Sequence, residues 1–468
     1  MLASAQSPWQ LGLCLPSTYA TKHMAIRSLK DSARDAIMSV LRRVSALNGV
    51  TRAETDSWIR AGDTFVRHTW NRLVYRVDLL PQLLQVSEFQ AFIRDLRSDQ
   101  AFSPFLNNYV GPVSGIGTFL HEVQLLNGLM PNDTDPIHPK GTLAFDEADF
   151  SPRFDALLRF RDAVDVPFVQ LRPLIGLVCT ETITIDAGLT LEPLSDEEIV
   201  QALTWGVLPT NMNQFREFRI EPGVTHAIKR RYHLPRVILP APPAHPTQTG
   251  HWAFSSDGDD VAHSLSILEK GKVIVGPTFL YSPMGWPYGI QSILQPTSFS
   301  DDPRGTRDIR LQAGAGPDVR ATWNALRSST AAYRLAARRF YNGHLRGLVE
   351  DMFLDDMISA EALLLFPHAQ QKARTLSLNA AYYLGENRQL DRQRIYDLFR
   401  DAYRVRSDIV HGQQPNPGHM RLNGAPVSFI EFEEAIESEL RRIFRKMVDQ
   451  HQSAAAMNWG AIVLGPNP

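Results

Sequence analysis

The sequence predicts an α+β protein with a helical region at each end and a mixed strand and helix region between them. Apolar residues recur at helical spacing over about residues 26–130, and again from Val319 to about Gln450. Between these regions, short runs in which apolar and polar residues alternate indicate strands. We therefore expect a helical N-terminal region at 1–150, a mixed middle domain at 151–315, an all-helical bundle at 316–455 and a tail at 456–468.

Length and charge exclude several classes of protein. A chain of 468 residues is long enough for roughly two to four domains, each with its own core. The 48 basic and 50 acidic side chains nearly cancel, which excludes a protein that coats nucleic acid through bulk positive charge but allows a local basic site. Two cysteines cannot form a disulfide framework or a cysteine-based zinc site. Because no apolar stretch is long enough to span a membrane, we expect a cytoplasmic protein without membrane contacts.

The N-terminal region opens with a helix that has one apolar side. Apolar residues recur at helical spacing over 37–47 and the pattern then stops at an Asn-Gly pair. Thr51 and Glu54 have the spacing of a capping box, in which each side chain binds the backbone of the other residue. This spacing predicts a second helix that carries Trp58 and Phe65.

The middle region begins with a hairpin signal. In ETITIDAGLTLEPL, apolar residues alternate with polar ones on both sides of a turn, which predicts two paired strands over 183–191. Ser195 and Glu198 then fit the capping pattern for a short helix. Further strands are expected at 272–280 and 308–311.

In the C-terminal region, the sequence predicts a series of helices after a linker at 314–318. The expected ranges are 319–345, 353–365, 373–384, 392–411 and 428–450. Gly385 and Gly412 directly follow two of these helices, where glycine commonly ends a helix. Ser428 and Glu431 fit a capping box at the start of the last one.

The candidate site is the segment RVRSDIVHG, from Arg404 to Gly412. A histidine moves protons near neutral pH, and the dipole of the predicted helix favours the protonated form of His411 at its C-terminal end. Arg404 or Arg406 can bind a phosphate with two parallel hydrogen bonds. Arg404, Asp408 and His411 share one side of a regular helix, whereas Arg406 lies about 140° from His411. Arg406 and His411 therefore meet only through a distorted helix end or across the two-fold axis of a dimer.

Three segments of the C-terminal region carry a family resemblance: DDMISAEALL at 355–364, AAYYLG at 380–385 and IYDLFRDAYRVRSDIVHG at 395–412. They resemble the HEPN superfamily, and specifically its ApeA-like branch. The segment at 173–198 is also similar to domains found before HEPN modules. The resemblance implies an all-helical, usually dimeric domain that is often a metal-independent endoribonuclease in phage defence, abortive infection or a toxin system.

The motif and the resemblance together predict the site residues. His411 is expected to act as general acid and base, Arg406 with Arg404 is expected to hold the phosphate, and the neighbouring polar residues assist. The expected catalytic residues are Arg404, Arg406, Ser407, Asp408 and His411. Arg400 is expected to bind substrate beside them. Glu361 lies on an otherwise apolar helix, so we expect it to pair with an arginine of 404–406 and orient it.

Other charged groups have a functional and a structural interpretation. The basic run at Lys229, Arg230 and Arg231 is a candidate RNA contact, or a solvated loop. Arg339 and His344 repeat the spacing of Arg406 and His411 and serve as a test of how specific that spacing is.

Structural alternatives also exist for the candidate site and for its neighbours. His411 itself can be a helix-end histidine without a catalytic role. Asp355 and Asp356 are expected to be surface or capping residues, and we expect no metal site and no cofactor.

The sequence thus predicts an endoribonuclease whose first 315 residues sense a signal or restrain the C-terminal domain. Its expected partners are an RNA substrate, a second copy of the chain and a phage-derived trigger. The alternatives are a catalytically silent HEPN module that binds RNA, binds a partner or dimerises, and a regulatory sensor whose ligand lies in the middle domain.

Overall fold

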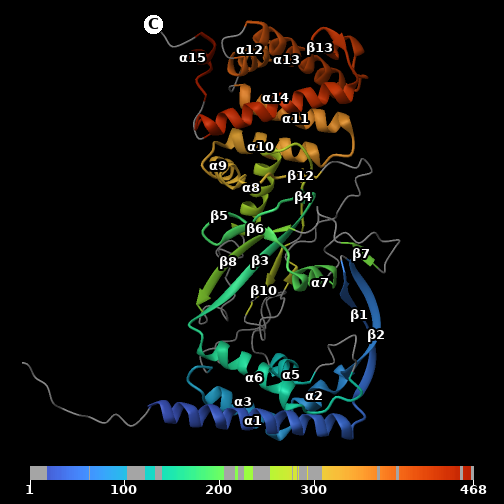
Figure 1. Cartoon of the computed structure of the whole chain (residues 1–468), viewed down its shortest axis with the longest axis vertical. Coiled ribbons are helices and arrows are strands. Elements are labelled where there is room, and N and C mark those ends of the chain that lie inside the picture. The colour runs from blue at the N-terminus through green and yellow to red at the C-terminus, as the bar shows by residue number, and fades with distance from the viewer. Residues whose placement is uncertain are drawn as a thin grey trace, which may run out of the picture.

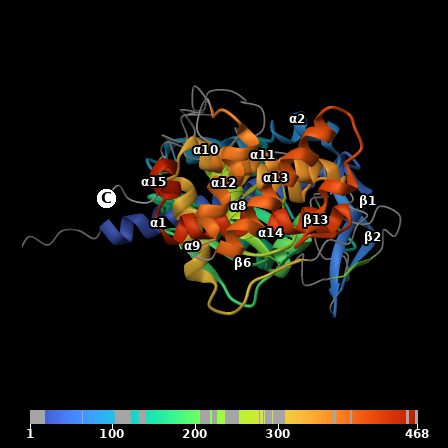
Figure 2. The ribbon, with the colours of Figure 1, turned by 90° about the horizontal axis from the view of Figure 1, so that it is seen from above.

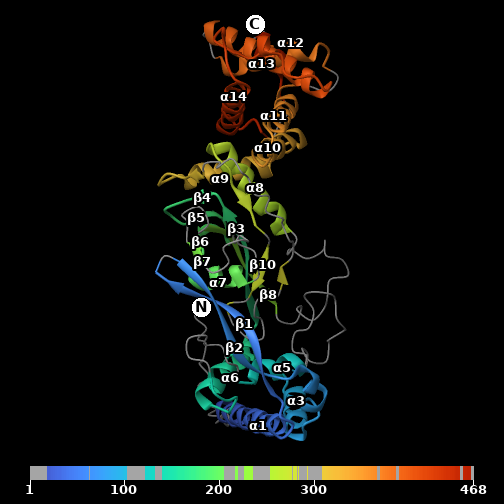
Figure 3. The ribbon, with the colours of Figure 1, turned by 90° about the vertical axis from the view of Figure 1, so that its right-hand side faces the viewer.

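Three tiers are stacked along the long axis of the molecule (Figure 1). The N-terminal helices lie at one end, the sheets lie in the middle and the C-terminal helices lie at the other end, as Figure 3 also shows. The predicted α+β class with a helical C-terminal region is confirmed. The computed structural model describes residues 18–62, 64–102, 122–131, 140–204, 217–219, 226–235, 253–276, 278–281, 283, 292–293, 308–365, 369–385, 389–453 and 457–464. None of the helices in these ranges combines the length and the apolar character that a membrane span needs.

The N-terminal tier is a helical layer held together by aromatic packing. Its helices are α1 (Thr18–Ala46), η1 (Val77–Leu79), α2 (Leu80–Leu83), α3 (Ser87–Ser98), α5 (Glu122–Leu129) and α6 (Glu147–Asp162). The predicted apolar side of α1 is buried between Ile37 and Val44, and Phe89, Phe92 and Phe154 lie in the same core. This shared burial stabilises the shorter helices α3 and α5, which would be marginal alone.

Residues 50–75 form a β-hairpin, so the helix predicted to open at Thr51 is wrong. Strands β1 (Val50–Ala61) and β2 (Thr64–Tyr75) pair antiparallel in continuous register. Threonine, valine and aromatic residues are dense here, and such side chains pack better on a pleated sheet than on a helix. Strand β2 also pairs with β7 (Glu217–Arg219), and Figure 2 shows the hairpin at one side of the stack.

An antiparallel sheet forms the middle tier, with the strand order β11-β10-β3-β8-β6-β5 and with β9 beside β3. Its strands are β3 (Asp165–Ile175), β5 (Ile183–Asp186), β6 (Leu189–Pro193), β8 (His226–Pro235), β9 (Ile274–Val275), β10 (Phe279–Tyr281) and β11 (Ser292–Ile293). A separate parallel pair joins β4 (Leu177–Val178) to β12 (Ile309–Arg310).

Two local predictions in this tier are confirmed. The hairpin β5–β6 pairs Ile183 with Leu191, and Gly188 in its turn has a positive φ of 78°, which only glycine adopts without strain. Helix α7 (Asp196–Thr204) is capped as expected. The backbone N–H of Ser195 donates to the Glu198 carboxylate at 2.7 Å, and that of Glu198 donates to the Ser195 hydroxyl at 3.2 Å.

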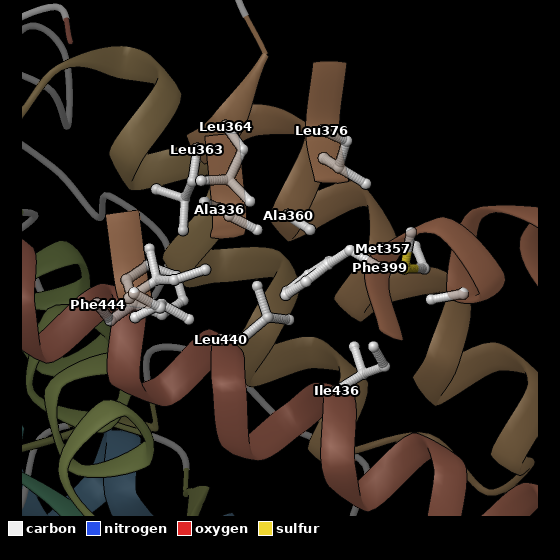
Figure 4. Packing of buried hydrophobic residues seen from close by; sticks show 14 of the residues in the cluster. Ala336, Met357, Ala360, Leu363, Leu364, Leu376, Phe399, Ile436, Leu440 and Phe444 are labelled. Carbon is white, nitrogen blue, oxygen red and sulfur yellow. The ribbon is translucent and has the colours of Figure 1, made fainter. Parts of the chain in front are cut away.

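The C-terminal tier is a helical bundle. It contains α9 (Gly316–Arg327), α10 (Ala331–His344), α11 (Val349–Leu364), α12 (Lys372–Leu384), α13 (Gln389–Val410), the short η5 (Pro417–His419), α14 (Phe429–Asp449) and α15 (Trp459–Leu464), with the small hairpin β13 (Arg421–Leu422) and β14 (Ala425–Pro426). Figure 4 shows Met357, Phe399 and Leu440 packed between α11, α13 and α14. The capping box of Ser428 and Glu431 at the start of α14 is confirmed.

The bundle differs from the sequence-based prediction at two places. The expected helix over 319–345 is two helices, because Ser328 and Ser329 bind backbone carbonyls of the preceding turn and Thr330 caps α10. The expected tail begins with a packed helix, α15, whose Trp459 is buried against the ring of Tyr383 at 5.9 Å between centroids. Residues 457–464 therefore belong to the bundle.

The middle and C-terminal tiers share their cores across the boundary expected at 315. Helix α8 (Ala253–Leu268) contributes Val261 and Leu265 to the core beside the sheet but Ile267 to the core of the bundle. In the other direction, Trp323 of α9 and Tyr341 of α10 join the core beside the sheet. These two tiers therefore form one packed unit.

His263 of α8 makes the stability of this unit depend on pH. Burial, with a smaller contribution from Arg338, lowers the pKa of His263 from 6.5 to about 4, although Asp260 lies 3.9 Å away. The unfolded chain therefore binds a proton between pH 6.5 and 4 that the folded chain excludes, so the free energy of unfolding falls as the pH falls through this range. We expect a loss on the order of 3 kcal/mol at pH 4. Urea titrations between pH 7 and 4 give the free energy of unfolding at each pH. This free energy should fall more steeply with falling pH for the wild type than for His263→Phe, and an equal pH dependence would refute the assignment.

Candidate functional site

Helix α13 carries most of the predicted site and is regular through Val410. Its buried side packs Phe399, Ala402 and Val405 into the core of the bundle. Because the helix is undistorted, the residues at 404, 408 and 411 lie on one side of it, as the 3.6-residue period requires. Arg404 and His411 are both exposed there.

The end of α13 places His411 at the helix terminus. Gly412 has a positive φ of 70°, its N–H donates to the carbonyl of Ile409, and the N–H of Gln413 donates to the carbonyl of Asp408. These are the two bonds of a Schellman motif, which ends a helix with glycine in a left-handed conformation. The predicted helix end before Gly412 is confirmed, and His411 occupies the last position, open to solvent.

Arg406 points to a different neighbour. Its Nε lies 3.3 Å from Oε1 of Glu361 on α11, so the expected pairing of Glu361 with an arginine of the motif is confirmed. Both side chains are largely covered, at 28% and 20% exposure. Within one chain, Arg406 therefore joins α13 to α11, while His411 faces solvent.

Arg400 and Arg404 of α13 interact with carboxylates of their own helix. Arg400 lies 2.6 Å from Asp397 and 3.0 Å from Asp401, and its hydrogen bond to Asp401 raises its pKa. Among the described residues, Arg404 contacts the carboxylate of Asp401 at 3.2 Å, and its side chain remains 51% exposed. Of these arginines, Arg404 has the guanidinium that is more accessible to a phosphate.

Ser407 and Asp408 have different local roles. The carbonyl of Ser407 accepts the last helical hydrogen bond, from the N–H of His411. The carboxylate of Asp408 accepts a 3.3 Å hydrogen bond from the backbone N–H of Asn416 and lies 3.6 Å from Nδ1 of His419. The sequence pattern does not single out His419, because it lies outside the helix that carries the motif.

The pair with the same spacing elsewhere in the bundle is structural. Arg339 lies 3.0 Å from Asp355, and His344 lies 3.0 Å from Glu437. Asp355 and Asp356 are buried, at 3% and 2% exposure, so the prediction that they are surface or capping residues is wrong. Their helix packs on α10 and α14, which turns both side chains inward.

The basic run in the middle tier belongs to a strand, so the expected solvated loop is wrong. Lys229 on β8 is buried, and its ammonium lies 2.7 Å from Glu198 and 3.0 Å from Glu192. Arg231 pairs with Glu192 as well, and Arg230 is half-buried. The carboxylates of this tier pair with Lys229 and Arg231, and Arg231 remains 47% exposed.

Within the described residues, no group of three or more histidine, cysteine, aspartate or glutamate side chains has the geometry to hold a metal ion. Cys179 is buried, and burial raises the pKa of its thiol. The polar groups at the end of α13 can bind an anion and transfer protons through their own side chains.

Comparison with known proteins identifies no relative of this chain. No family model matches the chain, and neither the curated proteins nor the solved structures contain a significant match.

Proposed function

We propose that the chain is a HEPN-type endoribonuclease that cuts RNA without a metal ion. The observation that supports this most is the exposed side of α13, on which Arg404, Asp408 and His411 follow one another up to the helix end. A cationic fork and an imidazole on one accessible surface are the groups that phosphodiester cleavage requires. The pair Arg339 and His344 has the spacing of the motif, but carboxylates of the bundle hold both side chains, so this spacing alone is no sign of a site.

The chemistry follows from these groups. The 2′-oxygen of the ribose loses its proton and bonds to the adjacent phosphorus, while the bond from phosphorus to the 5′-oxygen breaks and that oxygen gains a proton. The products are a 2′,3′-cyclic phosphate and a 5′-hydroxyl end. His411 transfers a proton, and Arg404 stabilises the charge that grows on the phosphoryl oxygens.

Arg406 has a role in this proposal only through a dimer. In one chain Glu361 holds it on the side of α13 away from His411. A second copy that brings its own His411 to Arg406 would form the composite site implied by the HEPN resemblance. Val410, which is 52% exposed next to His411, supplies an apolar contact for such a copy.

The middle tier is suited to control the site. Arg441 of α14 donates to the carbonyl oxygens of Ser266 and Glu269 at the end of α8, and α8 also packs against the sheet. A phage-derived trigger that binds the first 315 residues would therefore act on the bundle through α8. Defence against phage or a toxin system is the setting we propose.

The test is cleavage of RNA by the purified full-length chain at high protein concentration in EDTA, with analysis of the product ends. We expect cyclic phosphate ends from the wild type. Absence of cleavage, or cleavage that requires a metal ion, would reject the proposal.

Arg404→Ala and Arg406→Ala should have different effects. We expect Arg404→Ala to slow cleavage about 10- to 100-fold with unchanged stability, because it removes an exposed phosphate ligand. Arg406→Ala should lower the free energy of unfolding by about 1 to 2 kcal/mol, because Glu361 loses its partner. Single-turnover rates and urea unfolding of both variants measure this. A larger rate loss for Arg406→Ala would favour the composite dimer site over the single-chain site.

The alternative is a silent HEPN module that binds RNA, binds a partner or dimerises. The contact between Arg406 and Glu361 favours it, because this pair makes one motif residue a structural link between helices. A wild-type chain that binds RNA in EDTA but leaves it intact would support the silent module.

A further inference from the structure

A second histidine lies beside the motif. His419 is in η5, and its Nδ1 is 3.6 Å from the carboxylate of Asp408 on α13. This distance is slightly too long for a hydrogen bond, and Nδ1 is buried with no hydrogen-bond partner in the part of the chain that the structure describes. A buried ring nitrogen without a partner is uncommon, and catalytic hydrogen bonds are often loose before substrate binds.

The segment that carries His419 is fixed at both ends. Before it, the backbone of Asn416 donates to Asp408, and the Asn416 side chain accepts from Gly418 at 2.8 Å, which caps the short turn. After it, Met420 is buried in the core of the bundle. The turn thus holds the imidazole of His419 against the side of α13 that carries the motif.

The same side of α13 brings His411 to this place. Asp408 and His411 are three residues apart, so their Cβ atoms are about 5 to 6 Å apart on a regular helix. Side chains of a helix lean toward its N-terminus, which directs His411 back over the turn that contains Asp408. We therefore expect the His411 imidazole beside the carboxylate that faces His419, with Arg404 one turn before Asp408.

We propose that His419 is a second catalytic residue of this site and that Asp408 is its positioning residue. This inference rests on the ribonuclease function proposed above. Asp408 faces Nδ1, and a hydrogen bond that forms between them when substrate binds fixes the ring and leaves Nε2 for the substrate, as an aspartate does for the histidine of a catalytic triad. Nε2 of His419 takes the proton of the 2′-hydroxyl as the 2′-oxygen bonds to phosphorus. His411 gives a proton to the 5′-oxygen as its bond to phosphorus breaks.

The experiment compares two RNA substrates with the full-length chain. One is an ordinary oligonucleotide, and in the other a sulfur atom replaces the 5′-oxygen at the cleaved bond. A thiolate leaves without receiving a proton, so the sulfur substrate no longer needs a general acid. With the ordinary substrate, we expect His411→Ala and His419→Ala each to lose about 100-fold or more in rate. With the sulfur substrate, His411→Ala should return to within about 10-fold of wild type and His419→Ala should remain slow.

His419→Gln separates catalysis from a structural role. The glutamine amide can donate to Asp408 and hold the turn, but it cannot take a proton. We expect His419→Gln to unfold at the wild-type urea concentration and to be as slow as His419→Ala. A rate equal to wild type for His419→Gln, or recovery of His419→Ala with the sulfur substrate, would overturn the inference. A wild-type chain that cuts neither substrate would instead reject the ribonuclease function itself.

Discussion

Replacing His411 by alanine should lower the rate of RNA cleavage about 100- to 10,000-fold, the range associated with the loss of a proton-transfer group. His411 is exposed at the end of α13, and among the described residues its side chain makes no hydrogen bond or ion pair, so folding should be unaffected. Single-turnover cleavage and urea unfolding of the purified variant measure both effects. In cells, the same change should remove any toxicity of the expressed chain.

A matched control for His411→Ala is available in the same bundle. His451 is also exposed at a helix end, with a positive φ of 55° that asparagine tolerates, so His451→Asn should cleave RNA like the wild type. Arg339→Ala is unsuitable as a control, because Arg339 is a partner of the buried Asp355. Equal rates for wild type and His411→Ala would show that His411 is only a helix-end residue.

Replacing Arg441 by methionine should lower the free energy of unfolding by about 3 to 5 kcal/mol, as expected when one partner of a buried ion pair is removed. The Arg441 guanidinium is buried and binds Glu437, which also lies 3.0 Å from His344. Burial opposes ionisation of Glu437, but His344 and Arg441 lower its pKa to about 2, so Arg441 helps to hold a buried charge. The variant also leaves two carbonyl oxygens of the α8 end without their donor. Urea unfolding at neutral pH gives the value.

Arg445→Met is the matched control for this change. Arg445 lies one turn further along α14, is 47% exposed and reaches Glu269 only at 3.9 Å. An exposed pair of this kind contributes between 0 and about 1 kcal/mol. If the two variants were equally stable, the buried network around Arg441 would contribute no more than a surface contact.

Local sequence signals predicted the parts of the fold that depend on neighbouring residues. The caps at Ser195 and Ser428 and the helix end at Gly412 involve residues within three to five positions of each other, so the sequence displays them directly. The hairpin over 50–75 was mistaken for a helix because Thr51 and Glu54 fit a helix cap by chance, while the strand preference of the whole segment decides the structure.

The site was predictable to the extent that one helix determines it. Helical geometry placed Arg404, Asp408 and His411 together, and the burial cost of a carboxylate on an apolar helix predicted the partner of Glu361. His419 could not be found in this way, because a loop returns it to α13 and only the tertiary structure shows that contact. The burial of Lys229 depends likewise on Glu192 and Glu198, which reach it from another strand and a helix.

The sharing of α8 between two cores has a practical consequence for dissecting the protein. A fragment that starts at residue 316 would expose the apolar surface that Ile267 covers. It would also leave the Arg441 guanidinium without its carbonyl acceptors. Such a fragment is expected to aggregate on expression. A deletion that ends before residue 253 keeps α8 with the bundle but uncovers Val261 and Leu265, which pack in the core beside the sheet, so point substitutions are better suited to separate activity from control.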